Sequence, residues 1–465
     1  MDDRNRSTLH LERLGTTDEK GNRIYIHPED VKGKWVTRRK IVYLFLVFFY
    51  MVLPWIYWNG KQIIKLDIIN RKFYIFGETF FSHDGPLIFF LFLLFIMLLG
   101  FVTSILGRAW CGWTCPQTVY IDLIYRPIER LIEGKARQRK KLEDQSWNLN
   151  KISKKILKWS LFFIVSMHIS HTLLGYFVGT HELFHITTRN PALNPSLFTT
   201  MLFFTALFLF DFGWFREQFC IIACPYGRIQ SVMMDQNSLV VGYDYKRGEP
   251  RRNVGKIDHD NEGDCIDCQH CVKVCPTGID IRRGTQMECI ACTNCIDACD
   301  EIMDKLKRKP GLIRYTSESE LETGEMKKSK RPYLYLLFFI IVLSVFVVTL
   351  NKRENLTAQF IRVGETPYKL IDHEKIVLNR FKVSLYHNSD KQLNLSIESD
   401  RPNKVQIVQR KNPWPISPGK KQKIDIFVKI PREIFVNGSY RAVLKIKEDN
   451  QELFKKEVRF VGPFK

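Results

Sequence analysis

Eight cysteines in the second half of the chain are spaced for iron–sulfur chemistry. They form two successive runs of the pattern C-x2-C-x2-C-x3-C, at residues 265–275 and 289–299. Each run has the spacing with which bacterial two-cluster ferredoxins bind [4Fe–4S] clusters. A cubane requires four thiolates, and one tight loop wraps only three of them around it. We therefore expect the fourth cysteine of each run to reach across to the other cluster.

This crossed arrangement divides the eight cysteines between two clusters. The first cluster is predicted to be held by Cys265, Cys268, Cys271 and Cys299, and the second by Cys289, Cys292, Cys295 and Cys275. The second run is followed by Asp300 where the first is followed by proline, a departure that removes no ligand. Paired C-x2-C spacings also bind zinc. Two complete four-cysteine runs in tandem favour iron–sulfur clusters.

The other four cysteines form two matched pairs, Cys111 with Cys115 and Cys220 with Cys224, each in the pattern C-x3-C-P. At positions i and i+4 of a helix the two thiols would share a face, while the proline predicts a break or a new helix. Four thiolates at a membrane surface would bind a soft metal such as Cu(I) or cycle between dithiol and disulfide. The alternative is that they are small packing residues, because free cysteine is often buried.

Four histidines are weaker candidates. His168 and His171 lie near the middle of an apolar segment, where ionisable residues are functional candidates. They would bind copper, a haem or a quinone headgroup, or would hydrogen-bond a neighbouring helix. His181 and His185 follow that segment, where they would form a copper entry point or be ordinary exposed residues.

Five apolar stretches are long enough to position these residues at a bilayer, since a spanning helix needs about 20 residues. They are residues 41–58, 86–106, 156–178, 196–214 and 333–350. The first four form a four-helix membrane domain over 41–214. Two predicted helices precede each C-x3-C-P motif, and this weak internal repeat would place both cysteine pairs on one face of the membrane.

The charge distribution indicates a membrane protein with a defined orientation. The net charge is +21, from 70 Lys and Arg against 49 Asp and Glu, and the basic residues flank the apolar stretches. This pattern favours a lipid bilayer and argues against nucleic acid as the partner. The positive-inside rule places residues 1–40 and 215–332 in the cytoplasm, with the ferredoxin module at about 258–302. No cleavable signal peptide is expected.

The tail at residues 355–465 is predicted to be β structure on the outer side of the membrane. Several short segments alternate apolar and polar residues, and turn residues separate them. This spacing predicts an immunoglobulin-like sandwich. The tail contains no cysteine and no catalytic constellation, so we expect a binding or docking module.

With these motifs, the chain resembles the CcoG/FixG/RdxA family, the accessory proteins of cbb3-type cytochrome c oxidase. The resemblance spans nearly the whole chain. Besides the tandem ferredoxin runs and the cysteine-free tail, it is carried by Pro54-Trp55, Asn59-Gly60, Arg71-Lys-Phe-Tyr-Ile-Phe-Gly77, Gly107-Arg-Ala-Trp-Cys-Gly-Trp-Thr-Cys-Pro-Gln117 and Phe219-Cys-Ile-Ile-Ala-Cys-Pro-Tyr-Gly227. It implies a multi-pass protein of the bacterial inner membrane with a periplasmic immunoglobulin-like tail. It also implies a role in oxidase maturation, by reduction of Cu(II) to Cu(I) for the oxidase copper site.

Three functions remain open at this point. The first is a cupric reductase, in which an unidentified cytoplasmic donor reduces the clusters and they reduce copper at the four C-x3-C-P cysteines. Its partners would be the oxidase or its copper-delivery factors. The second is a quinol-linked electron carrier of the NapH/NosR type, which shares the C-x3-C-P and ferredoxin plan and would use His168 and His171. The third is a non-enzymatic scaffold that docks oxidase subunits through residues 355–465.

Overall fold

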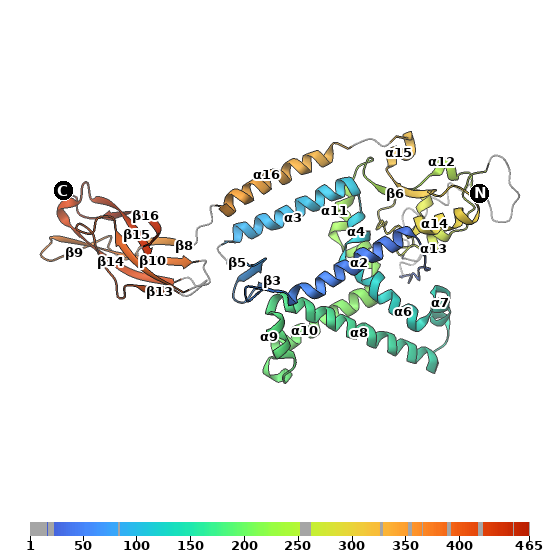
Figure 1. The fold of residues 1–465 in the computed structure, drawn as a ribbon, viewed down its shortest axis with the longest axis horizontal. Coiled ribbons are helices and arrows are strands. Elements are labelled where there is room, and N and C mark those ends of the chain that lie inside the picture. Colours follow the sequence, from blue (N-terminus) through green and yellow to red (C-terminus); the bar gives the residue numbers. More distant parts are fainter. Residues whose placement is uncertain are drawn as a thin grey trace. The chain divides into compact units, whose positions relative to one another are not determined.

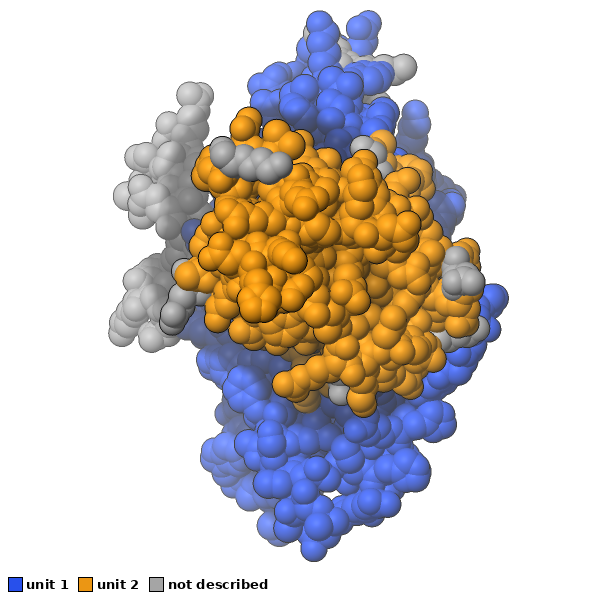
Figure 2. Space-filling view, turned by 90° about the vertical axis from the view of Figure 1, so that its left-hand side faces the viewer, with its two compact units in different colours: residues 1–66, 89–345 blue, residues 67–88, 346–465 orange. Residues whose placement is uncertain are grey.

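The structure is a computed structural model. It describes residues 16, 23–81, 84–251, 262–325, 329–351, 356–364, 366–387, 392–416, 422–449 and 451–464. Most of the predicted N-terminal segment up to residue 22 lies outside these described residues. The chain divides into two compact units (Figure 2), residues 1–66 with 89–345 and residues 67–88 with 346–465.

Four helices of the described residues are long and apolar enough to cross a bilayer (Figure 1). They are α3 (Gly85–Leu106), α8 (Leu149–Val178), α10 with its π-helical continuation η5 (Pro195–Phe208 and Leu209–Phe215), and α16 (Arg331–Asn351). Each contains one of the predicted spans. No side chain of α16 is buried within the protein, as expected for a helix that faces lipid.

The fifth predicted span, residues 41–58, is not confirmed as one membrane helix. The helix α2 covers Lys34–Val52, and a short 3-10 turn, η1, follows at Leu53–Trp55 before the strand β1 begins at Tyr57. Pro54 in this turn explains why the helix does not continue. The first two turns of α2 carry four basic residues, so the apolar part of the helix is shorter than a bilayer requires.

Nevertheless, α2 runs beside α8 in the same direction. The Tyr50 hydroxyl donates to the carbonyl of Ile169 at 3.1 Å, and the Thr180 hydroxyl donates to the carbonyl of Pro54 at 3.2 Å. The ends of the two helices therefore lie together. Antiparallel hairpins then lead to α3, through β1 (Tyr57–Trp58), β2 (Lys61–Gln62), β3 (Ile64–Asp67), β4 (Lys72–Ile75) and β5 (Glu78–Phe81).

Short helices follow each C-x3-C-P motif and connect the long ones. After α3 come α4 (Ala109–Trp113), α5 (Pro116–Tyr120), η3 (Ile121–Tyr125), α6 (Arg126–Glu133) and α7 (Ala136–Asp144). After α8 comes α9 (Thr180–Thr187), and after η5 come η6 (Phe219–Ala223) and α11 (Pro225–Met233). An aromatic core of Tyr120, Tyr125, Phe162 and Phe212 joins η3 to the long helices.

The two ferredoxin runs lie between two paired strands. Strand β6 (Val240–Tyr243) pairs antiparallel with β7 (Ile313–Thr316), which closes the module at its base. Each run includes the start of a short or longer helix: α13 (His270–Lys273) contains Cys271, and α14 (Asn294–Lys305) contains Cys295 and Cys299. The short helices α12 (Tyr245–Gly248) and α15 (Glu318–Thr323) flank the strand pair.

The tail is a two-sheet β structure, as the alternating pattern predicts. One sheet has the order β12-β14-β10-β8 with β9 beside β10, and the other has the order β13-β11-β15-β16. The strands are β8 (Leu356–Arg362), β9 (Lys369–Ile371), β10 (Ile376–His387), β11 (Leu393–Ser399), β12 (Gln406–Val408), β13 (Trp414–Ile416), β14 (Gln422–Pro431), β15 (Ser439–Glu448) and β16 (Gln451–Val461). Their inward-facing residues form a separate hydrophobic core.

Candidate iron–sulfur and thiol site

Two cavities in the module are lined by cysteines. The first is lined by Cys265, Cys268, Cys271 and Cys299, and the second by Cys275, Cys289, Cys292 and Cys295. These are the two sets that the crossed spacing predicts, although the assignment of ligands stays a prediction. Cys271 borders the second cavity as well, so the two cavities are neighbours.

The two cysteine loops have the same backbone course. The residues on either side of the second cysteine have positive φ in both runs, Asp267 and Gln269 at 52° and 58°, and Ala291 and Thr293 at 51° and 63°. These left-handed positions turn the loop so that successive thiols face one point. Sequence spacing alone does not reveal them.

The donor set fits [4Fe–4S] clusters. At least four thiols surround each cavity, and the remaining wall is largely apolar, as with Met303 and Leu312 around the first and Ile281 and Ile290 around the second. Burial raises the pKa of Cys271 and Cys299 to about 12, so these thiols are protonated until a metal cluster displaces the protons. A bound cluster would supply one-electron redox chemistry.

Helix α2 anchors the module through its first two turns. The Arg39 guanidinium donates to the carbonyl of Cys292 and, at 3.1 Å each, to the side chains of Asp122 and Asn294. The Asp297 carboxylate accepts from the backbone N–H of Val36 at 2.8 Å. A carboxylate at this position satisfies a free donor and complements the helix dipole.

The first C-x3-C-P loop contacts the second cysteine run directly. A Cβ placed on Gly112 would lie 2.5 Å from the carbonyl oxygen of Ala291 and 2.7 Å from that of Ile290. The Tyr43 hydroxyl donates to the carbonyl of Gly112 at 2.5 Å and fixes the loop from the α2 side. The backbone of the loop therefore touches the peptide between Cys289 and Cys292.

Arg108 connects three parts of the site. Its guanidinium donates to the carbonyls of Met287 and, at 3.2 Å, Cys289 in the second run. The other terminal nitrogen donates at 2.6 Å to the carbonyl of Gly227, which follows the second C-x3-C-P motif. Both thiol loops are thus held against the second cluster cavity.

The four thiols of the two motifs lie together. Cys111, Cys115 and Cys220 are each within electrostatic range of Cys224, and Cys220 is within range of the other two. Both prolines begin a new helix, α5 and α11, so the expected break occurs and the thiols of a pair do not share one helix face. The Cys111 thiol donates to the Gln230 side-chain oxygen at 3.0 Å.

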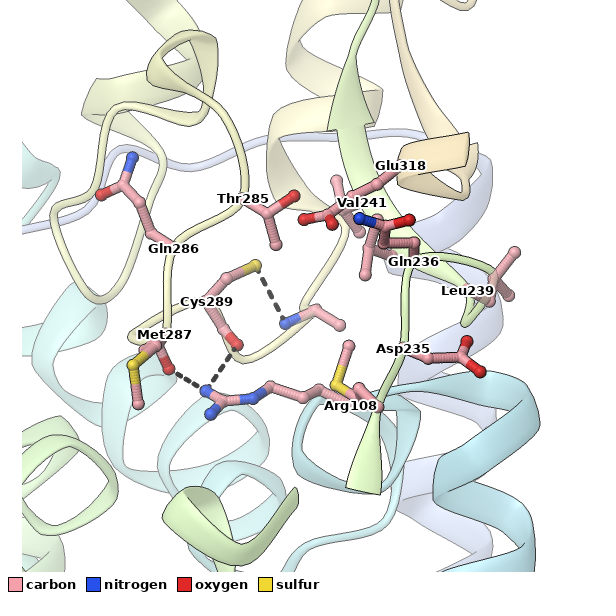
Figure 3. Close-up of a pocket in the computed structure, with 13 residues that line it drawn as sticks. Arg108, Asp235, Gln236, Leu239, Val241, Thr285, Gln286, Met287, Cys289 and Glu318 are labelled. Carbon is pink, nitrogen blue, oxygen red and sulfur yellow. Dashed lines mark hydrogen bonds between the residues drawn. The ribbon is translucent and has the colours of Figure 1, made fainter. Parts of the chain in front are cut away.

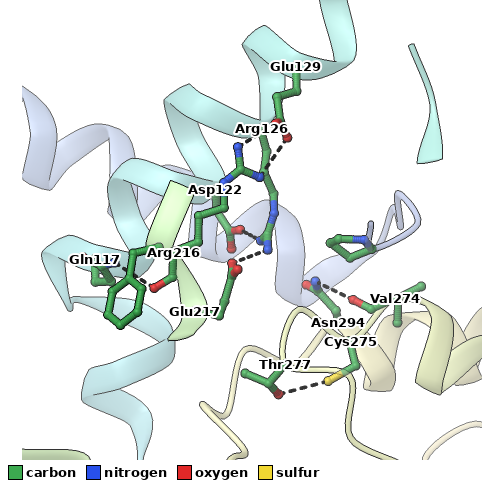
Figure 4. Close-up of polar contacts among 12 residues, drawn as sticks. Gln117, Asp122, Arg126, Glu129, Arg216, Glu217, Val274, Cys275, Thr277 and Asn294 are labelled. Carbon is green, nitrogen blue, oxygen red and sulfur yellow. Dashed lines mark hydrogen bonds and ion pairs between the residues drawn. The ribbon is translucent and has the colours of Figure 1, made fainter. Parts of the chain in front are cut away.

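A buried ionic network fixes the segment that leads to Cys220 (Figure 4). The Glu129 carboxylate accepts from both terminal nitrogens of Arg216, at 2.6 and 2.9 Å, and from Arg139 at 3.1 Å. Glu129 is 1% exposed, and the ion pairs hold its pKa down at about 2. Beside it, Arg126 pairs with Asp122 and Glu217.

The histidines do not join the thiols. His168 is exposed at the surface of α8, and the His171 ring lies 3.4 Å from the Thr187 hydroxyl. His181 packs 5.0 Å from the Tyr57 ring, and His185 is exposed. Within the described part of the chain, no three His, Cys, Asp or Glu side chains are grouped so as to hold a single metal ion.

Three family models match the chain. A 4Fe–4S dicluster domain matches residues 215–318, and a 4Fe–4S binding domain matches residues 86–136. The immunoglobulin-like fold at the C-terminus of FixG matches residues 346–463. These matches confirm the iron–sulfur module and the immunoglobulin-like tail.

Curated relatives match about two thirds of the chain. RdxA of Cereibacter sphaeroides is 37% identical over 67% of this chain and 67% of its own length. The nitrogen fixation protein FixG of Rhizobium meliloti is 40% identical over 67% of this chain and 61% of its own length. A crystal structure of a FixG-related protein from Vibrio parahaemolyticus aligns with 23% of this chain and 97% of its own, at 13% identity and a TM-score of 0.19.

Proposed function

Because the chain belongs to the FixG/RdxA family of iron–sulfur proteins, we propose that it passes electrons from two [4Fe–4S] clusters to the four C-x3-C-P cysteines. There it reduces Cu(II) to Cu(I). The cysteines are Cys111, Cys115, Cys220 and Cys224.

The observation that carries this proposal is the contact between the first thiol loop and the second cysteine run. Gly112 lies against the carbonyls of Ile290 and Ala291, and Arg108 donates to the carbonyl of Cys289. The two backbones lie this close together, so an electron on the second cluster would have a short path to the thiols. The adjoining cavities supply the preceding step, from the first cluster to the second.

Copper fits this site as a substrate. Thiolates are soft ligands that favour Cu(I), and Cu(II) takes up one electron, which is what a [4Fe–4S] cluster releases. One reduced cluster is oxidised for each Cu(II) that becomes Cu(I). The four thiols lie within electrostatic range of one another, so more than one of them can contribute to copper binding.

In the cell this activity would supply Cu(I) for the copper site of a cbb3-type oxidase. We place the protein in the bacterial inner membrane, with the module in the cytoplasm and the tail in the periplasm. The immunoglobulin-like tail would dock the oxidase or a copper-delivery factor. The basic flanks of the apolar helices and the family relationship support this placement.

The test is anaerobic copper reduction by the purified protein after its clusters have been reduced. Cluster oxidation is followed by EPR, and Cu(I) is measured with a chelator. A variant with the four cysteines changed to Ser is the control, because free Cu(II) oxidises exposed clusters unspecifically. We expect rapid Cu(I) formation in the native protein and a loss of it in the variant at equal cluster content. Equal rates in both would refute the proposal.

A further inference from the structure

We propose that a pocket beside the second cluster cavity binds the headgroup of a lipid-soluble hydroquinone, which donates the electrons. This inference rests on the proposed function and names its electron donor. The pocket is a cavity of about 380 Å³, within the range of small-ligand sites. Figure 3 shows its lining residues around a common hollow, with Arg108 and Cys289 on one side and Glu318, Gln236 and Val241 on the other.

The pocket adjoins a cluster ligand. Cys289 belongs to its wall, and Arg108 reaches from the wall to the carbonyls of Met287 and Cys289 (Figure 3). A ring bound there would be separated from the second cluster by one cysteine side chain. Electron transfer from the ring to the cluster would therefore not have to pass through a distant part of the protein.

The pocket also lies where the spanning helices end. Leu239 in its wall donates its N–H to the carbonyl of Ile105, in the last turn of α3, at 3.2 Å. Arg331, the first residue of α16, donates to the carbonyl of the lining residue Met234 at 3.1 Å. The pocket therefore lies beside the ends of two helices that are long and apolar enough to span a membrane, where a membrane-dissolved quinol would reach it.

The lining has the chemistry that a hydroquinone requires. Leu239, Val240 and Val241 provide apolar walls for the ring. Thr285 offers a hydrogen-bonding group for one of its hydroxyls, and the carboxylate of Glu318 is a potential proton acceptor. A purely apolar cavity would hold lipid tails without orienting a redox group.

The electrons balance with two clusters. A hydroquinone that becomes a quinone releases two electrons and two protons, and its two O–H bonds break. Each oxidised cluster takes one electron, so the pair of clusters accepts both. The two protons pass in turn to the Glu318 carboxylate and from there to water. Reduction of two Cu(II) ions then returns the clusters to the oxidised state.

The test uses menadiol as the electron donor and the full-length protein in detergent. Thr285, an exposed lining residue, is changed to Trp so that the indole fills the mouth of the pocket without altering the core. Arg283→Trp, two residues away and outside the lining, is the matched control. We expect menadiol to reduce the clusters of the native protein and of Arg283→Trp at similar rates. The clusters of Thr285→Trp should be reduced at least about tenfold more slowly.

Dithionite separates failure of this inference from failure of the proposed function, because it reduces the clusters without the pocket. If dithionite-reduced Thr285→Trp reduces copper normally while its reduction by menadiol is slow, the inference is supported. Equal menadiol rates in native protein and Thr285→Trp, or reduction by a soluble flavodoxin and not by menadiol, would overturn it. Failure of the dithionite-reduced native protein to reduce copper would refute the copper reaction, whatever the donor.

Discussion

At the residue scale, the two cysteine runs are alike in spacing and backbone but not in surroundings. The carbonyls of the second run accept hydrogen bonds from Arg39 and Arg108, and its Ala291 lies against Gly112. Arg39 lies in the first turns of α2, and Arg108 and Gly112 follow the end of α3. They would give the proposed electron path a direction, because the hydrogen bonds from Arg108 and the contact of Gly112 go to the second run.

The crossed assignment of ligands is testable with single substitutions. Cys299→Ser should damage the first cluster, because its other three ligands lie in the first run, and Cys275→Ser should damage the second. Iron content should fall from about eight to about four atoms per chain in each variant. EPR of the reduced proteins should show two different remaining signals. The same remaining signal in both variants would contradict the assignment.

Gly112 should be intolerant of any side chain. In Gly112→Ala the new Cβ would lie 2.5 Å from a backbone carbonyl, so the thiol loop and the second run must move apart. We expect clusters to be retained and their oxidation by Cu(II), followed by stopped-flow absorbance, to slow about tenfold or more. Gly100→Ala is the control, since its Cβ would meet Met233 at an ordinary 3.6 Å. A native-like rate of cluster oxidation in Gly112→Ala would show that this contact is not part of the electron-transfer path.

At the element scale, α2 connects the membrane helices to the iron–sulfur module. Its first turns bond the module through Arg39 and Asp297, and its last turn lies beside the end of α8. A helix with four basic residues at one end is poorly suited to lipid there. Of the four, Arg39 is buried against the carbonyl of Cys292 and the side chains of Asp122 and Asn294, and the other three are exposed. Arg39, one of the residues that shorten the apolar part of α2, thus also anchors the helix to the module.

Arg39→Ala should therefore destabilise the whole unit. Arg39 is 4% exposed, and its removal leaves Asp122 with one cation fewer and the carbonyl of Cys292 without this donor. Breaking a buried ion pair costs about 3–5 kcal/mol. The temperatures of thermal unfolding and of cluster loss on heating should both fall strongly. The exposed neighbour Lys40→Ala removes the same charge and should change little.

Sequence patterns predict those parts of the fold and of the site that depend on local spacing. The cysteine runs, four of the apolar helices and the alternation of the tail follow from periodicity, and the structure has each of them. The end of α2 at Pro54, the approach of Gly112 to Ala291 and the pocket at Leu239 depend on segments far apart in the chain. A single sequence contains no pairing information of that kind. Arg108 and Arg216 stand at similar offsets before the two motifs, yet one binds backbone carbonyls and the other Glu129.

At the scale of the whole molecule, the tail has the features of a separate module. Its core is formed only by residues of the β sandwich, from Leu356 to Phe460. A protein truncated after α16 should therefore keep its clusters and reduce copper at the native rate in vitro. In cells, oxidase activity should fall, and added copper should restore it only in part. Normal oxidase activity in cells without the tail would exclude a docking role.

The final prediction concerns the side of the membrane on which the segment between α2 and α3 lies. The end of α3 at Gly107 packs on Leu239 beside the module, and its 22 residues extend about 33 Å. If α3 spans the bilayer, we expect its start at Gly85 on the opposite face from the module. Since only short hairpins connect Trp55 to Gly85, the end of α2 is expected there too, although its composition is not that of a spanning helix.

Reporter fusions in a bacterial host measure this directly. Alkaline phosphatase, which is active only outside the cytoplasm, should be active when fused after residue 60 and inactive when fused after residue 145, beyond α7. Green fluorescent protein, which fluoresces in the cytoplasm, should give the reverse result at the two positions. A fusion after residue 464 reports the side of the tail and should match residue 60. An inactive phosphatase at residue 60 together with an active one at residue 464 would mean that α2 does not cross the membrane. The expected positions of the N-terminus and the module relative to α3 would then be wrong.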